Sequence, residues 1–196
     1  MRYLQKGFTI LFIICSLLGM PLYAKTSPFF TQISVGISAV QYGDSEINKK
    51  TETVKDLDDS FSFIISTDAS LGIILSEEVR LVAGGYFVSD INTNREYYAN
   101  HLDYGMFSGV RIYTGLAGLV FGVDYDCGSC SSFYNLEDDG TSSDTTAWGN
   151  GYRFLLEYDF SNGTERFAPI LDLSWRHMPR GSYSDNNFTV SFKLSV

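Results

Sequence analysis

The chain has 196 residues, and its 14 Lys and Arg stand against 23 Asp and Glu, which gives a net charge of −9 at pH 7. A chain this acidic repels the phosphate backbone, so nucleic acid is excluded as a partner. Three cysteines are too few to hold a fold of this length together with disulfides. The fold must therefore be specified by the pattern of apolar and polar side chains.

The first 24 residues have the three parts of a secretory signal. Arg2 and Lys6 form a basic start, residues 8–20 form an almost continuous apolar run, and Ala24 is a small residue at its exit. The run is shorter than the roughly 20 apolar residues that a membrane-spanning helix needs. We predict cleavage after Ala24. The mature chain, 25–196, then keeps 12 basic and 23 acidic residues, a net charge of −11.

Apolar and polar side chains alternate along much of the mature chain. Side chains alternate between the two faces of a strand, so this period of two predicts strands with one apolar and one polar face. Phe188, Val190 and Phe192 show it most clearly, with Thr189 and Ser191 between them. Eight segments share the pattern: residues 32–42, 61–75, 79–87, 98–112, 117–126, 148–160, 167–176 and 187–196.

The connections between these segments alternate in length. Those after the second, fourth and sixth segments are short, whereas residues 43–60 and 127–147 form long connections. Short turns at one end and long loops at the other are typical of a membrane barrel. The alternative is a soluble, lipocalin-like periplasmic barrel with its apolar face inward. The small residues on the polar faces and the aromatic residues at strand ends favour the membrane barrel.

Together, the signal peptide, the eight alternating segments and the terminal segment ending in Val196 resemble the small outer-membrane barrels of the OmpA/OmpX type. The resemblance covers essentially the whole mature chain and concerns its architecture, and Val196 departs from the usual terminal Phe. It implies an all-β fold, an eight-stranded antiparallel up-and-down transmembrane β-barrel with short periplasmic turns and longer extracellular loops. It also implies a monomer in the bacterial outer membrane, in contact with outer-membrane lipids and lipopolysaccharide and inserted by the barrel assembly machinery.

Ionisable residues lie on the polar faces of the predicted strands. The interior of an eight-stranded barrel is narrow enough for side chains to fill it, and buried charges need partners. We predict a salt-bridged plug, with Arg153 and Glu157 as partners, and keep a narrow pore for protons or ions as the alternative. The predicted interior network consists of Asp68, Arg80, Asp103, Arg111, Asp124, Arg153, Glu157, Asp172, Arg176 and Lys193.

Three further features are candidates for chemistry. His177 with Ser182 and Ser184 gives a weak alternative, a lipid A-modifying acyl hydrolase, although its spacing lacks the tight His-x-Ser of such enzymes. Cys127 and Cys130 fall in a predicted loop, where they form a disulfide or remain free thiols. The long loops are acidic but contain no twelve-residue calcium loop, so we predict no metal and no cofactor.

These patterns favour a structural or surface-interaction protein over an enzyme. The predicted barrel displays acidic loops outside the cell toward an extracellular ligand that the sequence does not specify.

The prediction for processing is direct. Intact-mass analysis of the protein from the cell envelope should show a chain that lacks residues 1–24, because the basic start, apolar run and small exit residue direct export and cleavage. A mature protein that retains Met1 would contradict the predicted topology.

Overall fold

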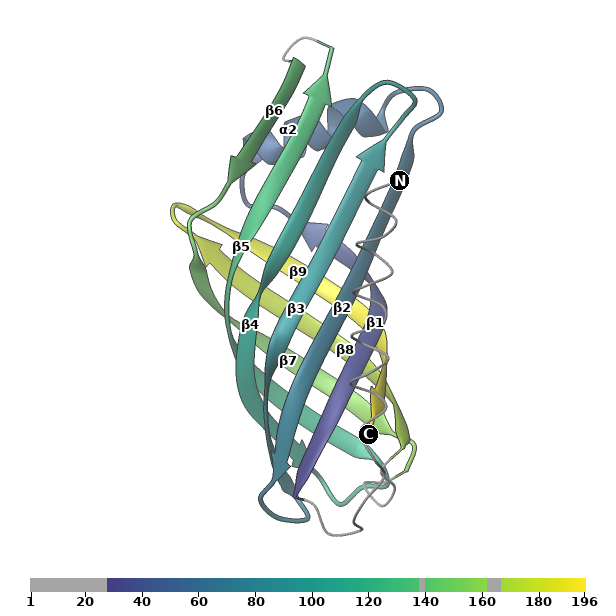
Figure 1. The fold of residues 1–196 in the computed structure, drawn as a ribbon, viewed down its shortest axis with the longest axis vertical. Helices are drawn as coiled ribbons and strands as arrows, with labels where there is room; N and C mark the ends of the chain where they lie inside the picture. Colours follow the sequence, from purple (N-terminus) through teal and green to yellow (C-terminus); the bar gives the residue numbers. More distant parts are fainter. Residues whose placement is uncertain (1–27, 138–139, 162–166) are drawn as a thin grey trace, which may run out of the picture.

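A computed structural model describes residues 28–137, 140–161 and 167–196, so the predicted signal peptide lies outside the described part. Within those ranges eight antiparallel strands close into a barrel (Figure 1). Each barrel strand pairs with the next one along the chain, and β1 pairs with β9 to close the ring. The predicted eight-stranded up-and-down barrel is confirmed. Its strands are β1 (Phe29–Gln41), β2 (Phe61–Ile74), β3 (Val79–Thr93), β4 (Tyr98–Tyr113), β5 (Leu119–Leu136), β7 (Gly149–Asp159), β8 (Ala168–Arg180) and β9 (Tyr183–Ser195).

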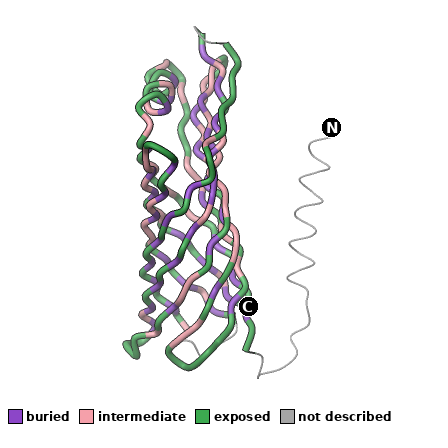
Figure 2. The backbone as a smooth tube through the Cα atoms, turned by 90° about the vertical axis from the view of Figure 1, so that its left-hand side faces the viewer, coloured by how far each residue is buried: buried purple, intermediate pink, exposed green. Residues whose placement is uncertain are grey.

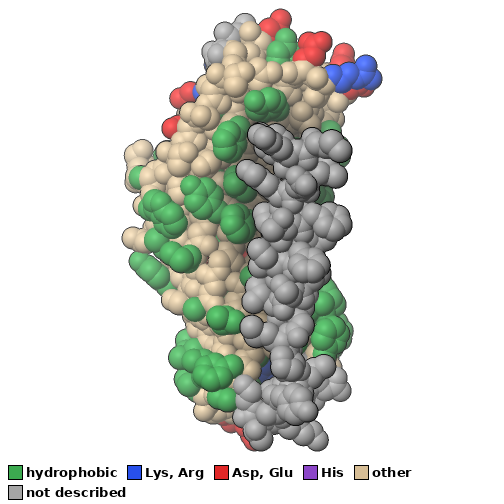
Figure 3. Space-filling view, viewed as in Figure 1, with side chains coloured by type: hydrophobic (Ala, Val, Ile, Leu, Met, Phe, Trp, Pro, Cys, Tyr) green, Lys and Arg blue, Asp and Glu red, His purple; other side chains and the backbone are tan. Residues whose placement is uncertain are grey.

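Apolar side chains of the barrel point outward and charged side chains point inward. On β7, Phe154 and Leu156 are 48% and 39% exposed, whereas Arg153 and Glu157 are each 2% exposed. The same alternation of buried and exposed residues follows the backbone around the wall (Figure 2), and hydrophobic side chains are spread over its outer surface (Figure 3). A soluble lipocalin-like barrel would bury its apolar face, so this alternative is wrong. An outward apolar face is what a barrel surrounded by lipid requires.

Aromatic side chains gather on the outer wall where β7 and β8 reach the long-loop end. The ring centroids of Tyr152 and Trp175 are 5.7 Å apart, and those of Tyr104 and Trp148 are 6.2 Å apart. Tyr and Trp prefer the boundary between the acyl chains and water. We take this group, called the aromatic rim below, as the outer limit of the membrane-spanning part. Among the described residues, no helix is long and apolar enough to cross a membrane.

Strands β2–β5 continue past the aromatic rim (Figure 1). β7 pairs with β5 only as far as Gly128, and beyond that point β5 pairs with the added strand β6 (Gly140–Thr145). The segment predicted as a loop over 127–147 is therefore mostly a β-hairpin. We call this extension the protruding sheet, which comprises Phe61–Ile64, Asp90–Thr93, Tyr98–Leu102, Ser129–Leu136 and β6.

The other long connection, residues 43–60, contains the helix α2 (Ser45–Lys55). Its N-cap is Asp44, whose carboxylate accepts a hydrogen bond from the backbone N–H of Glu46, as helix starts prefer. The helix buries Ile47, Thr51 and Val54. Val54 packs in one apolar cluster with three residues on the inner face of the protruding sheet: Ala99, Tyr134 and Leu136. Burying one such side chain stabilises the fold by about 1.5–3 kcal/mol.

Glycines make room for the polar interior. A Cβ at Gly109 on β4 would collide with the carboxylate of Asp124, and one at Gly128 on β5 would collide with the hydroxyl of Tyr86. A larger residue at either position would displace a buried polar group. Part of the glycine content of the polar faces is thus explained by the width of the interior.

Candidate functional site

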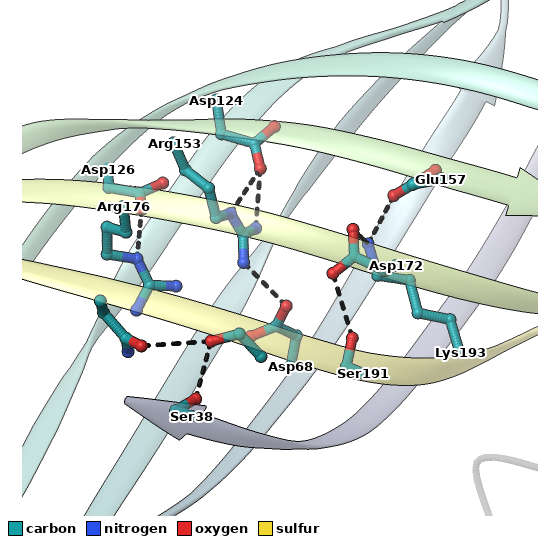
Figure 4. Close-up of polar contacts among 12 residues, drawn as sticks. Ser38, Asp68, Asp124, Asp126, Arg153, Glu157, Asp172, Arg176, Ser191 and Lys193 are labelled. Atoms are coloured by element: carbon teal, nitrogen blue, oxygen red, sulfur yellow. Dashed lines mark hydrogen bonds and ion pairs between the residues drawn. The ribbon is translucent and has the colours of Figure 1, made fainter. Parts of the chain in front are cut away.

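The centre of the barrel holds a guanidinium that bridges opposite walls. Arg153 on β7 donates hydrogen bonds to Asp68 on β2 at 2.8 Å and to Asp124 on β5 at 2.7 Å (Figure 4). β2 and β7 face each other across the ring, as the strand order shows. Arg153 also lies over the ring of Phe107, with 4.3 Å between the guanidinium carbon and the ring centroid. The fork of donors on Arg suits such paired carboxylates.

Toward the short-turn end, a second group of charges fills the interior. Glu157 accepts hydrogen bonds from Lys193 on β9 and, at 3.2 Å, from Arg111 on β4. Lys193 also pairs with Asp172 at 3.2 Å, and Ser191 donates a hydrogen bond to the other oxygen of Asp172 (Figure 4). The network therefore links four barrel strands through side chains alone.

The expected partnership of Arg153 and Glu157 is wrong. The two residues are on the same strand and face the same way, but each reaches across the interior to other strands. Side chains separated by four positions on one strand lie about 13 Å apart along it, too far for a direct ion pair.

Closer to the aromatic rim, the two Arg residues of β8 pair with separate carboxylates. Arg176 donates to Asp126 at 2.6 Å and lies over the ring of Tyr86, 3.5 Å from its centroid. Arg180 donates to Asp103 at 2.6 Å and to Asp185 at 2.7 Å. Arg180 and Asp185 are not among the predicted interior residues, because the seventh segment was predicted to end at residue 176 and the eighth to begin at residue 187. The strand in fact continues to Arg180, and the alternation from Arg176 through Met178 was the signal.

The remaining predicted network residue, Arg80, lies at the short-turn end. Its guanidinium carbon is 4.0 Å from the ring centroid of Tyr113 and 5.6 Å from that of Phe30. The space between Asp68, Arg111, Arg153 and Lys193 has a volume of about 10 Å³, roughly one water molecule. Side chains therefore fill this level of the interior.

The predicted His177 site does not assemble as a catalytic group. His177 is half-buried on the outer wall, where Nδ1 and the side-chain oxygen of Asn186 are 3.0 Å apart and the ring of Tyr152 is 5.2 Å away. Ser182 lies in the turn, and Ser184 is paired across the ladder with Pro179. Asp185, the neighbour of Ser184 in the chain, faces inward toward Arg180 and so does not orient the imidazole.

The two cysteines lie in strand β5 and not in a loop. Both are free thiols, with Cys130 buried and Cys127 partly exposed. Three positions separate them, and neighbouring side chains on a strand alternate between its faces, so the two thiols face opposite sides of the barrel wall. This arrangement excludes the disulfide that we considered between them.

A polar cluster lies inside the protruding sheet, beyond the charged interior. The hydroxyl of Tyr42 donates to Asp90 at 2.9 Å, and Asn92 donates to the other oxygen of Asp90 at 2.7 Å. The His101 ring is 4.8 Å from the ring of Tyr42 and contacts Thr51 of α2. His101 lies on the inward face of β4, and its contact with a helix was not predictable from strand alternation.

The fold is that of known outer-membrane barrels. No protein-family model matches the chain, and no curated protein matches its sequence. The structure matches Ail, the attachment invasion locus protein of Yersinia pestis, in complex with the heparin analogue sucrose octasulfate. The TM-score is 0.56 at 10% identity, over 86% of this chain and 99% of Ail. Neisserial surface protein A matches with a TM-score of 0.50 at 11% identity, over 86% of this chain and 97% of that one. The chain thus has the OmpA/OmpX-type barrel fold.

We expect the buried pair of Asp126 and Arg176 to behave as one unit. Asp126→Asn or Arg176→Met alone should lower the free energy of unfolding by about 3–5 kcal/mol, because each leaves a buried charge without its partner. The double variant should lose less than the sum of the two. Reversible urea unfolding of the barrel in detergent micelles measures this.

The matched control is Arg95, which pairs with Asp59 at 3.2 Å while 85% exposed. Arg95→Met should cost less than about 1 kcal/mol. Strictly additive losses at Asp126 and Arg176, or losses as small as that of Arg95→Met, would show that the interior charges do not act as pairs.

Proposed function

We propose that this protein is an outer-membrane barrel, exported with residues 1–24 as its signal, whose function is to bind an extended protein segment outside the cell. The free edge of β6 is the proposed binding surface, and the bound segment is basic. The charged interior is the proposed structural plug that holds the barrel shut. The observation that carries the proposal is an unprotected strand edge at the far end of the protruding sheet, whose connecting segments are acidic.

Strand β6 has an open side. Within the described ranges it pairs only with β5, and all of Gly140–Thr145 is exposed. The N–H of Thr146 donates to the carbonyl of Cys130 at 2.9 Å, so the ladder bonds are made by the even-numbered residues. Ser143, opposite Phe133, therefore directs its N–H and C=O to the open side.

Natural proteins usually protect such an edge with Lys, Pro or a bulge. β6 reads Gly-Thr-Ser-Ser-Asp-Thr and contains neither Lys nor Pro. An extended segment that adds to an exposed edge gains main-chain hydrogen bonds, and its side chains supply the specificity. The composition of β6 therefore suits strand addition.

The charge around β6 indicates which kind of segment would bind there. In residues 42–60, 94–97, 137 and 140–148 there are 9 acids and 4 bases. The acids include Glu137 and Asp144 of the β5–β6 hairpin, and Glu96 of the β3–β4 turn, whose backbone carbonyl accepts a hydrogen bond from Asn135 of β5. Acidic side chains also gather at the upper end of the molecule in Figure 3. Such a surface attracts Lys and Arg and repels sulfated sugars. The heparin analogue bound to Ail is therefore a poor guide to the ligand of this chain.

Ser143→Pro tests the edge directly. Proline removes the outward N–H of Ser143 but leaves the ladder to β5, so it should be tolerated in an edge strand. Binding of a fluorescein-labelled peptide of alternating Lys and Val should weaken about tenfold or more, because one hydrogen bond contributes about 0.5–1.5 kcal/mol and the ring also blocks close approach. Fluorescence anisotropy with the barrel in nanodiscs measures the affinity.

Ser143→Ala keeps the N–H and should bind the basic peptide like the parent protein. The corresponding peptide of alternating Glu and Val should bind poorly to all three proteins. Equal binding of the basic peptide to the Pro and Ala variants, or no binding to the parent, would overturn the proposal.

A further inference from the structure

We propose that α2 is an acid-released cover on the inner face of the protruding sheet, with His101 as its proton sensor. At neutral pH the helix is docked, and protonation of this one imidazole undocks it and exposes the apolar surface beneath. The inference concerns the inner face of the sheet and does not depend on binding at the β6 edge.

The docking contacts are few and are centred on His101. The helix has 11 residues, too short to be stable alone in water. Among the described residues, its contacts with the sheet include the apolar cluster around Val54, Lys50 over the ring of Tyr134, and a polar contact in which Thr51 Oγ1 and His101 Nε2 are 2.9 Å apart. His101 is 2% exposed, and its Nδ1 is 2.8 Å from the hydroxyl oxygen of Ser132 on β5. His101 therefore connects the helix to the sheet.

The hydrogen bonds specify a neutral imidazole. The hydroxyl of Thr51 donates its one hydrogen to the backbone carbonyl of Ile47 at 2.8 Å. Thr51 must then accept from His101, which places the proton on Nε2. Nδ1 is thus the unprotonated nitrogen, and it accepts a hydrogen bond from Ser132. A second proton on Nδ1 would break this bond and leave a positive charge in a buried site.

Nearby charges do not offer the imidazolium a partner. Asp90 on β3 favours the protonated form, but Tyr42 and Asn92 already donate to its two oxygens. Lys55 of α2 disfavours it. Lys50 of α2 lies over the ring of Tyr134 on β5 and pairs with Glu46 at 2.7 Å, so its charge already has a partner.

Burial is the main cause of a low affinity for protons. His101 lies three residues beyond Tyr104 of the aromatic rim, outside the membrane-spanning part of β4. Its burial lowers the pKa from 6.5 to about 4. A base with a depressed pKa favours docking fully above pH 6.5, and this contribution is lost as the pH falls toward 4. The two values correspond to a loss of about 300-fold in the docking equilibrium, with about tenfold already lost at pH 5.5.

Hydrogen exchange of the α2 amides in the folded barrel measures docking. Between pH 7.5 and 5.5 the protection of α2, corrected for the intrinsic exchange rate, should fall about tenfold. Amides of β9 should remain fully protected. Glu46 in the first turn of α2 stays ionised over this range, because its hydrogen bond and ion pair with Lys50 lower the pKa of its carboxyl.

The matched variant is His101→Gln, which keeps a donor for Thr51 but cannot be protonated. Its α2 protection should be the same at both pH values. Where the Gln variant is unprotected at pH 7.5, His101→Asn, which keeps an acceptor for Ser132, serves instead. Constant protection in the parent protein, or the same tenfold fall in the variant, would overturn the proposal.

Discussion

The guanidinium of Arg153 joins a carboxylate of the neighbouring strand, Asp124, to one of the opposite wall, Asp68, and the rest of the structure is arranged around contacts of this kind. An interior this narrow and surrounded by lipid offers little water to a charge, so each buried charge needs an opposite charge within reach. The long side chains of Arg and Lys reach acids both on the adjacent strand, as Arg153 reaches Asp124, and across the interior, as Arg153 reaches Asp68. Gly109 and Gly128 follow from the same constraint, since a side chain there would occupy space that the network needs.

The division of the molecule into two parts also follows from the need to pair every charge inside the barrel. Below the aromatic rim, outward side chains are apolar and the interior is closed by paired charges. Beyond the rim, β3, β4 and β5 continue into water, and there the inner face is covered by a helix instead of by an opposite wall. Sites that can reach other molecules therefore lie in the protruding sheet. Its free edge and its helix-covered face are separate surfaces. The edge offers main-chain hydrogen bonds, whereas the covered face buries apolar side chains and His101.

Period-two alternation was sufficient to predict the barrel, because β7 alternates without a break between buried and exposed residues. The identity of the interior residues followed from the same pattern. The pairings did not, because Arg153 meets Asp68 only after the ring has closed, and closure is not a local property. The loop end was harder to predict. The β5 extension starts with Gly and Ser, which are typical of a loop, so its strand was not predicted. The helix α2 packs on this sheet, so it could not be predicted either.

The contact on which the whole arrangement depends is the one between the outward apolar face of the barrel and lipid. Val123 and Phe133 both point outward from β5 and are 49% and 45% exposed, but only Val123 lies below the aromatic rim. The direct measurement is the free energy of unfolding of Val123→Arg and Phe133→Arg in thin bilayers. Val123→Arg should cost about 2–4 kcal/mol, the range for a charge on the lipid face near the midplane, and Phe133→Arg less than about 1 kcal/mol. Equal, small losses in a protein that stays soluble without detergent would contradict the account.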